Sequence, residues 1–334
     1  MKRTRPTSGR PAIWGGTILG SILRILEWCA RQGSTLLVCG ILIGLFVPPL
    51  AAAMREVLTP CVFLLMLLAL LRVDPSRALS YLRRPLLVAA LCAWLLLACP
   101  MIAFAIAWTT GLTTGEAASF GAALVIMATG CAATSSPAFA RLVGLDGELS
   151  LVVALFTTLL VPFTAPPLAL GLLGIDLSIS IPALMARLAL LVGLPLILSL
   201  ILRHRLGTDR LERAGGAVDG SVVLLVVIYG FGVMDGILDR LLAEPLMMAA
   251  GTALAFAGSL GLNALTALAF RPAGAGPALT AGLLSGNRNM SLYLAVLPAA
   301  TDARILLFFA LCQFPLFFSP LLLKPLYRRL HRQG

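Results

Sequence analysis

Charged side chains are scarce in this chain of 334 residues, where Asp, Glu, Lys and Arg together make up 12%. Soluble globular domains carry about 25% charged residues. With 60% hydrophobic residues, the composition excludes an ordinary soluble protein and indicates a membrane protein. The net charge of +11 does not indicate a nucleic-acid partner, because the basic residues lie in short loops between apolar segments.

Histidine and paired cysteine are also nearly missing. The two histidines are His204 and His331, and the seven cysteines are scattered singly without a Cys-x-x-Cys pair. This pattern indicates neither a disulfide framework nor a zinc site, and it leaves almost no material for a Ser-His-Asp triad. We therefore expect no enzyme activity and no metal centre, and the expected partners are the lipid bilayer and a small solute.

Apolar segments of bilayer length are what the chain has in quantity. About ten are present, at roughly 34–53, 56–72, 85–109, 117–140, 149–174, 182–202, 217–235, 243–270, 277–300 and 303–324. The first two are separated only by Arg55-Glu56, which predicts a tight helical hairpin. Arginine and lysine gather in alternate loops, so the positive-inside rule predicts an even number of spans, with both termini cytoplasmic.

Two short terminal stretches flank a single transmembrane domain predicted over 34–325. Residues 1–33 combine a basic tail with a segment in which Ile18, Ile22 and Ile25 oppose Arg24 and Arg31, which predicts a helix lying in the membrane interface. A signal peptide is the alternative, although no small-residue cleavage site ends the segment. Residues 326–334 form a basic C-terminal tail.

Ten spans divide into two sets of five, and an odd number per set gives the second set the opposite orientation. This predicts an all-α membrane protein built as two inverted five-helix repeats. Both fourth members are interrupted, span four within Met127-Ala-Thr-Gly-Cys-Ala-Ala-Thr-Ser-Ser-Pro-Ala138 and span nine by Ser285-Gly-Asn-Arg-Asn289. Paired interruptions predict two broken, crossing helices that line a binding cavity; simple kinks for helix packing are the alternative.

At these two interruptions the chain resembles the bile acid:sodium symporter family. The resemblance is densest in Thr134-Ser-Ser-Pro137, Leu149-Ser150, Thr157-Thr158 and Gly286-Asn-Arg-Asn289. It implies an inner-membrane location and a core domain (about 85–174 and 243–325) that holds the crossing. It also implies a panel domain (about 34–72 and 182–237), with the substrate bound between the two.

The positions that hold sodium in this family are only partly matched. Ser136, Ser150 and Asn289 match ligand positions, whereas Leu284, Arg288, Pro137 and Ala154 replace the Glu, Gln, Asn and Thr of the family pattern. A fixed guanidinium repels a sodium ion strongly in a low-dielectric cavity. These replacements argue against sodium coupling, and the resemblance implies no cofactor other than that ion.

Arg288 is the residue most expensive to place in a bilayer, at about 2.5–3.5 kcal/mol on insertion scales. We expect it to supply the positive charge that sodium supplies in the family. No Asp or Glu lies deep inside a predicted span, so its partners are half-helix carbonyls, the amides of Asn287 or Asn289, or an anionic substrate. If the substrate is the partner, Arg288→Gln abolishes anion binding. The predicted substrate-binding residues are Arg288, Asn287, Asn289, Ser285, Thr134 and Ser135.

These observations predict a secondary active or facilitative transporter of an organic anion, either bile-acid-like or a small carboxylate, that works by alternating access. A sodium-coupled symporter using backbone and hydroxyl ligands is the first alternative. A non-transporting membrane receptor on the same fold is the second, although such a receptor usually carries a soluble signalling domain, which this sequence does not show.

Overall fold

The computed structural model describes residues 18–72, 84–173, 179–297 and 301–333, and these are almost entirely helical. The predicted basic tail up to residue 17 lies outside them. In chain order the elements are α1 (Ile18–Arg31), α2 (Gly33–Phe46), α3 (Pro48–Arg55), α4 (Leu58–Leu71), α6 (Pro85–Ala93), η1 (Trp94–Ala98), α7 (Cys99–Thr109), η2 (Gly115–Ala117), α8 (Ala118–Thr129), α9 (Ser136–Val143), α10 (Gly147–Leu173), α11 (Ile181–Leu206), α12 (Thr208–Arg213), α13 (Gly215–Val233), α14 (Ile237–Ala243), α15 (Pro245–Ala269), η3 (Arg271–Ala273), α16 (Ala275–Gly286), α17 (Ser291–Val296), α18 (Ala303–Leu311) and α19 (Gln313–Gln333).

Five helical stretches in the described chain are long and apolar enough to cross a bilayer: 85–109, 147–172, 181–206, 215–243 and 245–269. Two bent pairs, 20–31 with 35–46 and 48–55 with 58–71, raise the number to seven. The other predicted spans fall on interrupted helices, namely α8 with α9, α16 with α17, and α18 with α19. The all-helical class and the multi-pass character are therefore shown, whereas ten spans and the inverted repeat stay predictions.

The reversal after the first predicted span differs from the tight hairpin expected at Arg55-Glu56. The segment predicted as one helix over 34–53 is divided at Val47, because Pro48 and Pro49 occupy the first turn of α3 and push the preceding residue out of the helical region. The short α3 then meets α4 at a bend of 70°. The chain therefore uses three helices, α2, α3 and α4, where the sequence pattern predicted two.

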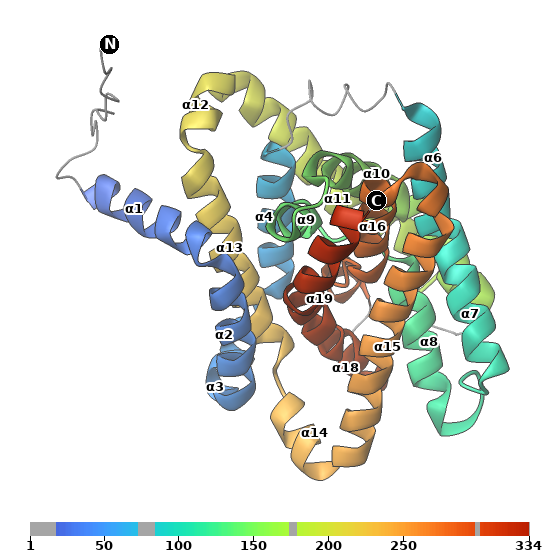
Figure 1. Ribbon diagram of the computed structural model, residues 1–334. Coiled ribbons are helices and arrows are strands. Elements are labelled where there is room, and N and C mark those ends of the chain that lie inside the picture. Colours follow the sequence, from blue (N-terminus) through green and yellow to red (C-terminus); the bar gives the residue numbers. More distant parts are fainter. Residues whose placement is uncertain (1–17, 73–83, 174–178, 298–300, 334) are drawn as a thin grey trace.

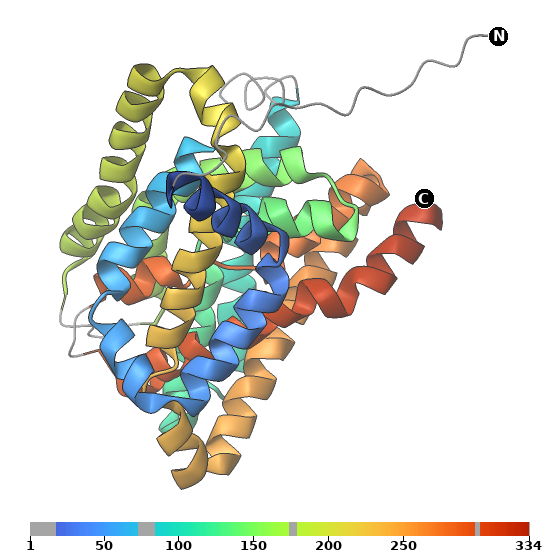
Figure 2. The same ribbon diagram turned by 90° about the vertical axis from the view of Figure 1, so that its left-hand side faces the viewer.

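Two groups of helices lie side by side in Figure 1. On the left, α13 packs against α1, α2, α3 and α4; on the right, α7 packs against α8. Figure 2 shows α1 crossing in front of α13, with α11 at the edge of the molecule. The division into panel and core domains implied by the family resemblance stays a prediction, as does their independent movement.

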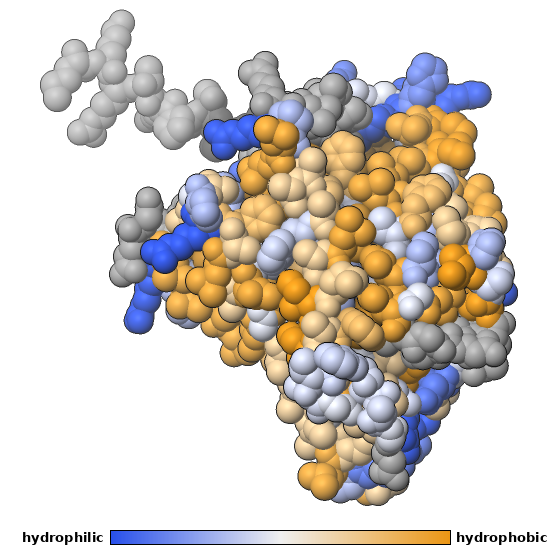
Figure 3. Space-filling model, turned by 90° about the vertical axis from the view of Figure 1, so that its right-hand side faces the viewer, coloured by the Kyte–Doolittle hydropathy of each residue, from blue (hydrophilic) through white to orange (hydrophobic). Residues whose placement is uncertain are grey.

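Ion pairs fasten α13 to its neighbours at both of its ends. Arg72 pairs with Asp219 at 2.8 Å near one end, and Arg55 pairs with Asp235 at 2.9 Å beyond the other. On the opposite side of the molecule, the side of α6 and α7 in Figure 1, hydrophobic residues cover most of the middle of the face in view (Figure 3). Asp219 is half exposed and bound to Arg72, so it lies at the margin of the apolar region.

Glycines bring α16 close to α15. A Cβ added to Gly282 would lie 2.7 Å from the Asn263 carbonyl oxygen, and one added to Gly286 would lie 2.7 Å from the Ser259 carbonyl oxygen. The Ser259 hydroxyl also donates to the Gly286 carbonyl at 2.8 Å. This Gly-x-x-x-Gly contact, common between membrane helices, fixes the end of α16 at the second interruption.

Candidate functional site

The two predicted interruptions meet in the structure. α8 ends at Thr129 and α9 begins at Ser136, while α16 ends at Gly286 and α17 begins at Ser291. The two extended links run antiparallel: the Ala133 amide donates to the Asn287 carbonyl at 2.8 Å, and the Asn289 amide donates to the Cys131 carbonyl at 2.9 Å. These bonds frame a bridge between Ala132 and Arg288 and leave four helix ends converging on one point.

The extended link around Arg288 sends successive side chains to opposite sides, as any β-like segment does. The Arg288 guanidinium reaches η1, which packs against α6, α7, α8 and α10. The Asn287 amide oxygen instead accepts a bond from Ser319 of α19 at 3.5 Å. The crossing therefore has two chemically different faces, a cationic one toward η1 and an amide one toward α19.

Arg288 is 3% exposed and its bonds go to backbone carbonyls. Its Nε donates to Ser285 at 2.9 Å, and its Nη1 donates to Gly130 at 2.9 Å and to Leu95 at 3.0 Å. These bonds use three of the five guanidinium N–H donors. The two hydrogens on Nη2 have no partner among the described residues. The sequence left three kinds of partner open for Arg288, and in the structure the guanidinium bonds to backbone carbonyls.

Two helix dipoles balance the Arg288 charge without an acidic side chain. Gly130 follows the last residue of α8, and Ser285 lies in the last turn of α16. A helix C-terminus carries about half a unit of negative charge, so two of them offset one guanidinium. The ion pairs Arg72–Asp219 and Arg55–Asp235 both lie elsewhere. Arg288 therefore keeps a formal positive charge, which the two helix ends stabilise.

The third carbonyl that binds Arg288, that of Leu95, is left free by a proline. In η1, a π-helical turn, the Cys99 amide donates to the Trp94 carbonyl five residues earlier. The next bond of this pattern would run from residue 100 to Leu95, but Pro100 has no N–H. The Leu95 carbonyl is left for Arg288. Sequence reasoning missed this partner, and the sequence signal for it is a proline inside the apolar run 85–109.

The other predicted substrate-binding residues divide by exposure. Ser285 is fully buried and its hydroxyl bonds Thr266 at 2.8 Å and Cys99 at 3.4 Å. Asn289 is 7% exposed and its amide oxygen accepts from Ser291. Thr134 is exposed and Ser135, the N-cap of α9, is half-buried. The structure thus brings all these residues to one crossing and gives solvent contact chiefly to Thr134 and Ser135.

The residues at the crossing do not fit a sodium ion at the position that Arg288 occupies, because the guanidinium already takes three oxygens and carries positive charge. Nearby, the hydroxyls of Ser136 and Ser150 are fully buried and have no hydrogen-bond partner in the described chain. Pro137 and Leu284 bring no side-chain oxygen, and the Ala154 carbonyl already accepts from Thr157 and Thr158. Two neutral hydroxyls without a carboxylate make a poor cation site.

Comparison with protein families gives one finding: residues 59–237 match the Sodium Bile acid symporter family. The match covers just over half of the chain. It includes the first interruption with Pro137 and Ala154, and it ends before Leu284 and Arg288. A search of the curated proteins finds no match.

Proposed function

Because the chain belongs to the sodium bile acid symporter family, we propose that it is a secondary transporter that carries an organic anion across the membrane by alternating access. The observation that carries the proposal is the crossing, where two interrupted helices expose backbone groups inside an apolar protein. Irregular backbone at membrane depth is tolerated where it is buried in protein or lines a cavity. We place the protein in the inner membrane with both termini cytoplasmic, as the loop arginines predict.

The anionic group of the substrate binds at the start of α9. Thr134 and Ser135 are the most accessible polar residues of the crossing, and they precede the first turn of a helix whose positive end attracts anions. Arg288, which is buried beneath these residues at the crossing, adds positive charge and holds the two links in place. Asn287, whose amide nitrogen lacks a partner in the described chain, offers a second donor on the face toward α19.

Transport is independent of sodium in this proposal. A guanidinium bound to Gly130, Ser285 and Leu95 provides a fixed positive charge where the family pattern provides an ion. An added cation would be repelled by this neighbouring positive charge. The second candidate, a sodium-coupled symporter, is favoured by one observation, the unpartnered hydroxyls of Ser136 and Ser150.

Thermal stabilisation of the purified protein by ligands tests both candidates. Organic anions, including steroid carboxylates, sulfonates and small carboxylates, are added in sodium chloride or in choline chloride of equal ionic strength. A ligand that binds the folded state raises the melting temperature by mass action. We expect at least one anion to stabilise the protein equally in both salts. Stabilisation in sodium alone would establish the second candidate, and none from any anion would overturn the transporter proposal.

A further inference from the structure

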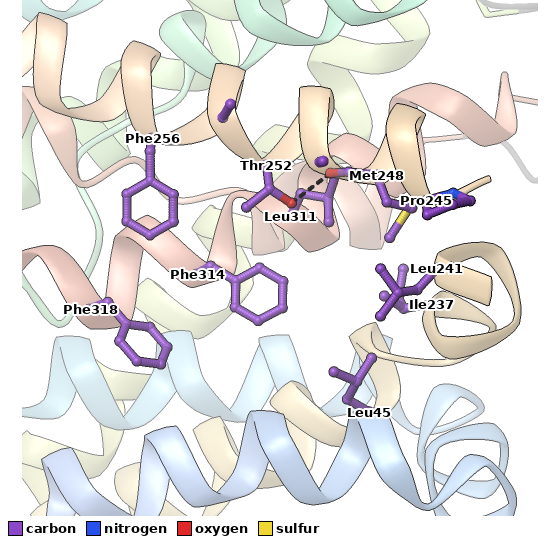
Figure 4. Close-up of a pocket in the computed structure, with 12 residues that line it drawn as sticks. Leu45, Ile237, Leu241, Pro245, Met248, Thr252, Phe256, Leu311, Phe314 and Phe318 are labelled. Atoms are coloured by element: carbon purple, nitrogen blue, oxygen red, sulfur yellow. Dashed lines mark hydrogen bonds between the residues drawn. The ribbon is translucent and has the colours of Figure 1, made fainter. Parts of the chain in front are cut away.

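An apolar groove with a volume of about 560 Å³ lies between the two groups of helices (Figure 4). One wall consists of Leu45 from α2 with Ile237 and Leu241 from α14. The opposite wall is formed by α15, α18 and α19, and it presents the rings of Phe256, Phe314 and Phe318. The groove is separate from the residues proposed to bind the anion.

The chemistry of the groove excludes a polar or charged ligand group. Thr252 is the polar side chain among its lining residues, and its hydroxyl donates to the Met248 carbonyl of the same helix at 2.8 Å. No other lining residue has a side chain that can form a conventional hydrogen bond. A carboxylate or sulfonate moved here from water would lose its hydration without compensation. The occupant must therefore be hydrocarbon.

The length of the groove matches the depth of one membrane leaflet. It follows α15 from Pro245 to Phe256, twelve residues whose eleven steps span about 16 Å at a rise of 1.5 Å per residue. Half of a bilayer hydrocarbon core is about 15 Å thick. The groove begins where α14 meets α15, beside the exposed charges of Asp239 and Glu244 that are typical of a membrane surface.

The side of the groove along α15 is also open to apolar surroundings. Ala249 and Ala253 line it and are exposed, and Leu246 beside its entry is 83% exposed. In a multi-pass membrane protein such side chains face lipid. We propose that the groove binds one acyl chain of a phospholipid from the leaflet on the α14 side. The chain fills the space between the two helix groups, so the lipid is part of their interface.

Quenching by brominated phospholipids tests this site directly. The full-length Phe256→Trp protein is reconstituted in vesicles of phosphatidylcholine brominated on the acyl chains, and its fluorescence is compared with that of the wild type to remove the signal of the four native tryptophans. We expect strong quenching of the new tryptophan and little quenching by aqueous iodide. Iodide quenching without bromolipid quenching would show a water-filled groove and overturn the proposal.

Two alanines one turn apart provide a matched pair for a second measurement. Ala253 lines the groove, whereas Ala257 is exposed on α15 and does not line it. Ala253→Phe should fill the groove and abolish the rise in melting temperature when phospholipid is returned to delipidated protein, while Ala257→Phe should keep that rise. Equal responses would contradict the proposal. Relief of bromolipid quenching by an organic anion would instead identify the apolar body of the substrate as the occupant.

Discussion

The two interruptions of the crossing have similar backbones and opposite chemistry. The first, residues 130–135, has no charged or amide side chain; it contributes the Gly130 carbonyl to Arg288 and exposes Thr134. The second, residues 287–290, contributes the guanidinium and both asparagines, all buried. The comparison separates two tasks: the second link supplies the charge that holds the crossing together, and the first supplies a carbonyl acceptor and the exposed residue that we propose contacts the anion.

Removing the charge should have the largest effect. We expect Arg288→Met to lower the free energy of unfolding by about 3–5 kcal/mol, because three buried carbonyls lose their donors at once. Chemical unfolding in detergent measures the change. Arg205→Met, at an exposed position on α11, serves as the control and should stay close to the wild type. Equal stability of the two variants would show that the second link does not depend on its charge.

Replacing the guanidinium by a neutral amide in Arg288→Gln should allow a sodium ion to take its place. In Arg288→Gln the carbonyls of Leu95, Gly130 and Ser285 are freed for a cation. We expect this variant, unlike the wild type, to be stabilised by sodium, by about 2.7 kcal/mol when sodium exceeds its Kd a hundredfold. Anion binding should become dependent on sodium as well. Potassium and choline chloride are the controls, and an unchanged melting temperature in sodium would contradict the idea that the guanidinium stands in for an ion.

The third carbonyl allows a double-mutant cycle. Pro100→Ala restores an amide that competes with Arg288 for the Leu95 carbonyl, so it should destabilise the wild type. In the Arg288→Met background the same change should stabilise, because Leu95 then regains a donor. The expected coupling is about 1 kcal/mol, measured from the four unfolding free energies. Additive effects would show that the π-helical turn and Arg288 are independent.

The first interruption should be nearly neutral for stability. Thr134→Val alters an exposed side chain, so the free energy of unfolding should change by no more than about 0.5 kcal/mol. The same variant should lose most of the stabilisation by organic anions. The melting temperature with and without anion gives both quantities. If Thr134→Val binds the anion as tightly as the wild type, the anion does not contact the side chain of this residue.

Local sequence was enough to place the crossing. Small hydroxyl residues before Pro137, and asparagines around Arg288, have no place inside an uninterrupted apolar helix, so both breaks were found at the right residues. The absence of nearby acids also limited the partners of Arg288 to a short set. Which member of that set is used depends on how α8 and α16 meet, and no local pattern contains that information.

Other features depended on tertiary packing or were outweighed by a stronger pattern. Pro100 predicts a bend, but whether a helix bends or forms a π turn depends on what accepts and donates nearby, here Arg288. The Pro48-Pro49 pair did signal a helix start, yet counting apolar residues to bilayer length concealed it. The groove between α2, α14 and α15 required the fold, because its walls come from segments about two hundred residues apart.

The guanidinium at the crossing also bears on energetics across a charged membrane. An ion that travels with its substrate can cancel the substrate's charge, whereas Arg288 stays in the protein through every cycle. A monovalent anion carried alone therefore moves one net negative charge. A potential of 100 mV, negative inside, opposes its entry by about 2.3 kcal/mol and favours its exit by the same amount. At equal concentrations on the two sides, the carrier we propose would therefore export a monovalent anion, and a one-for-one exchange of such anions would be independent of the voltage.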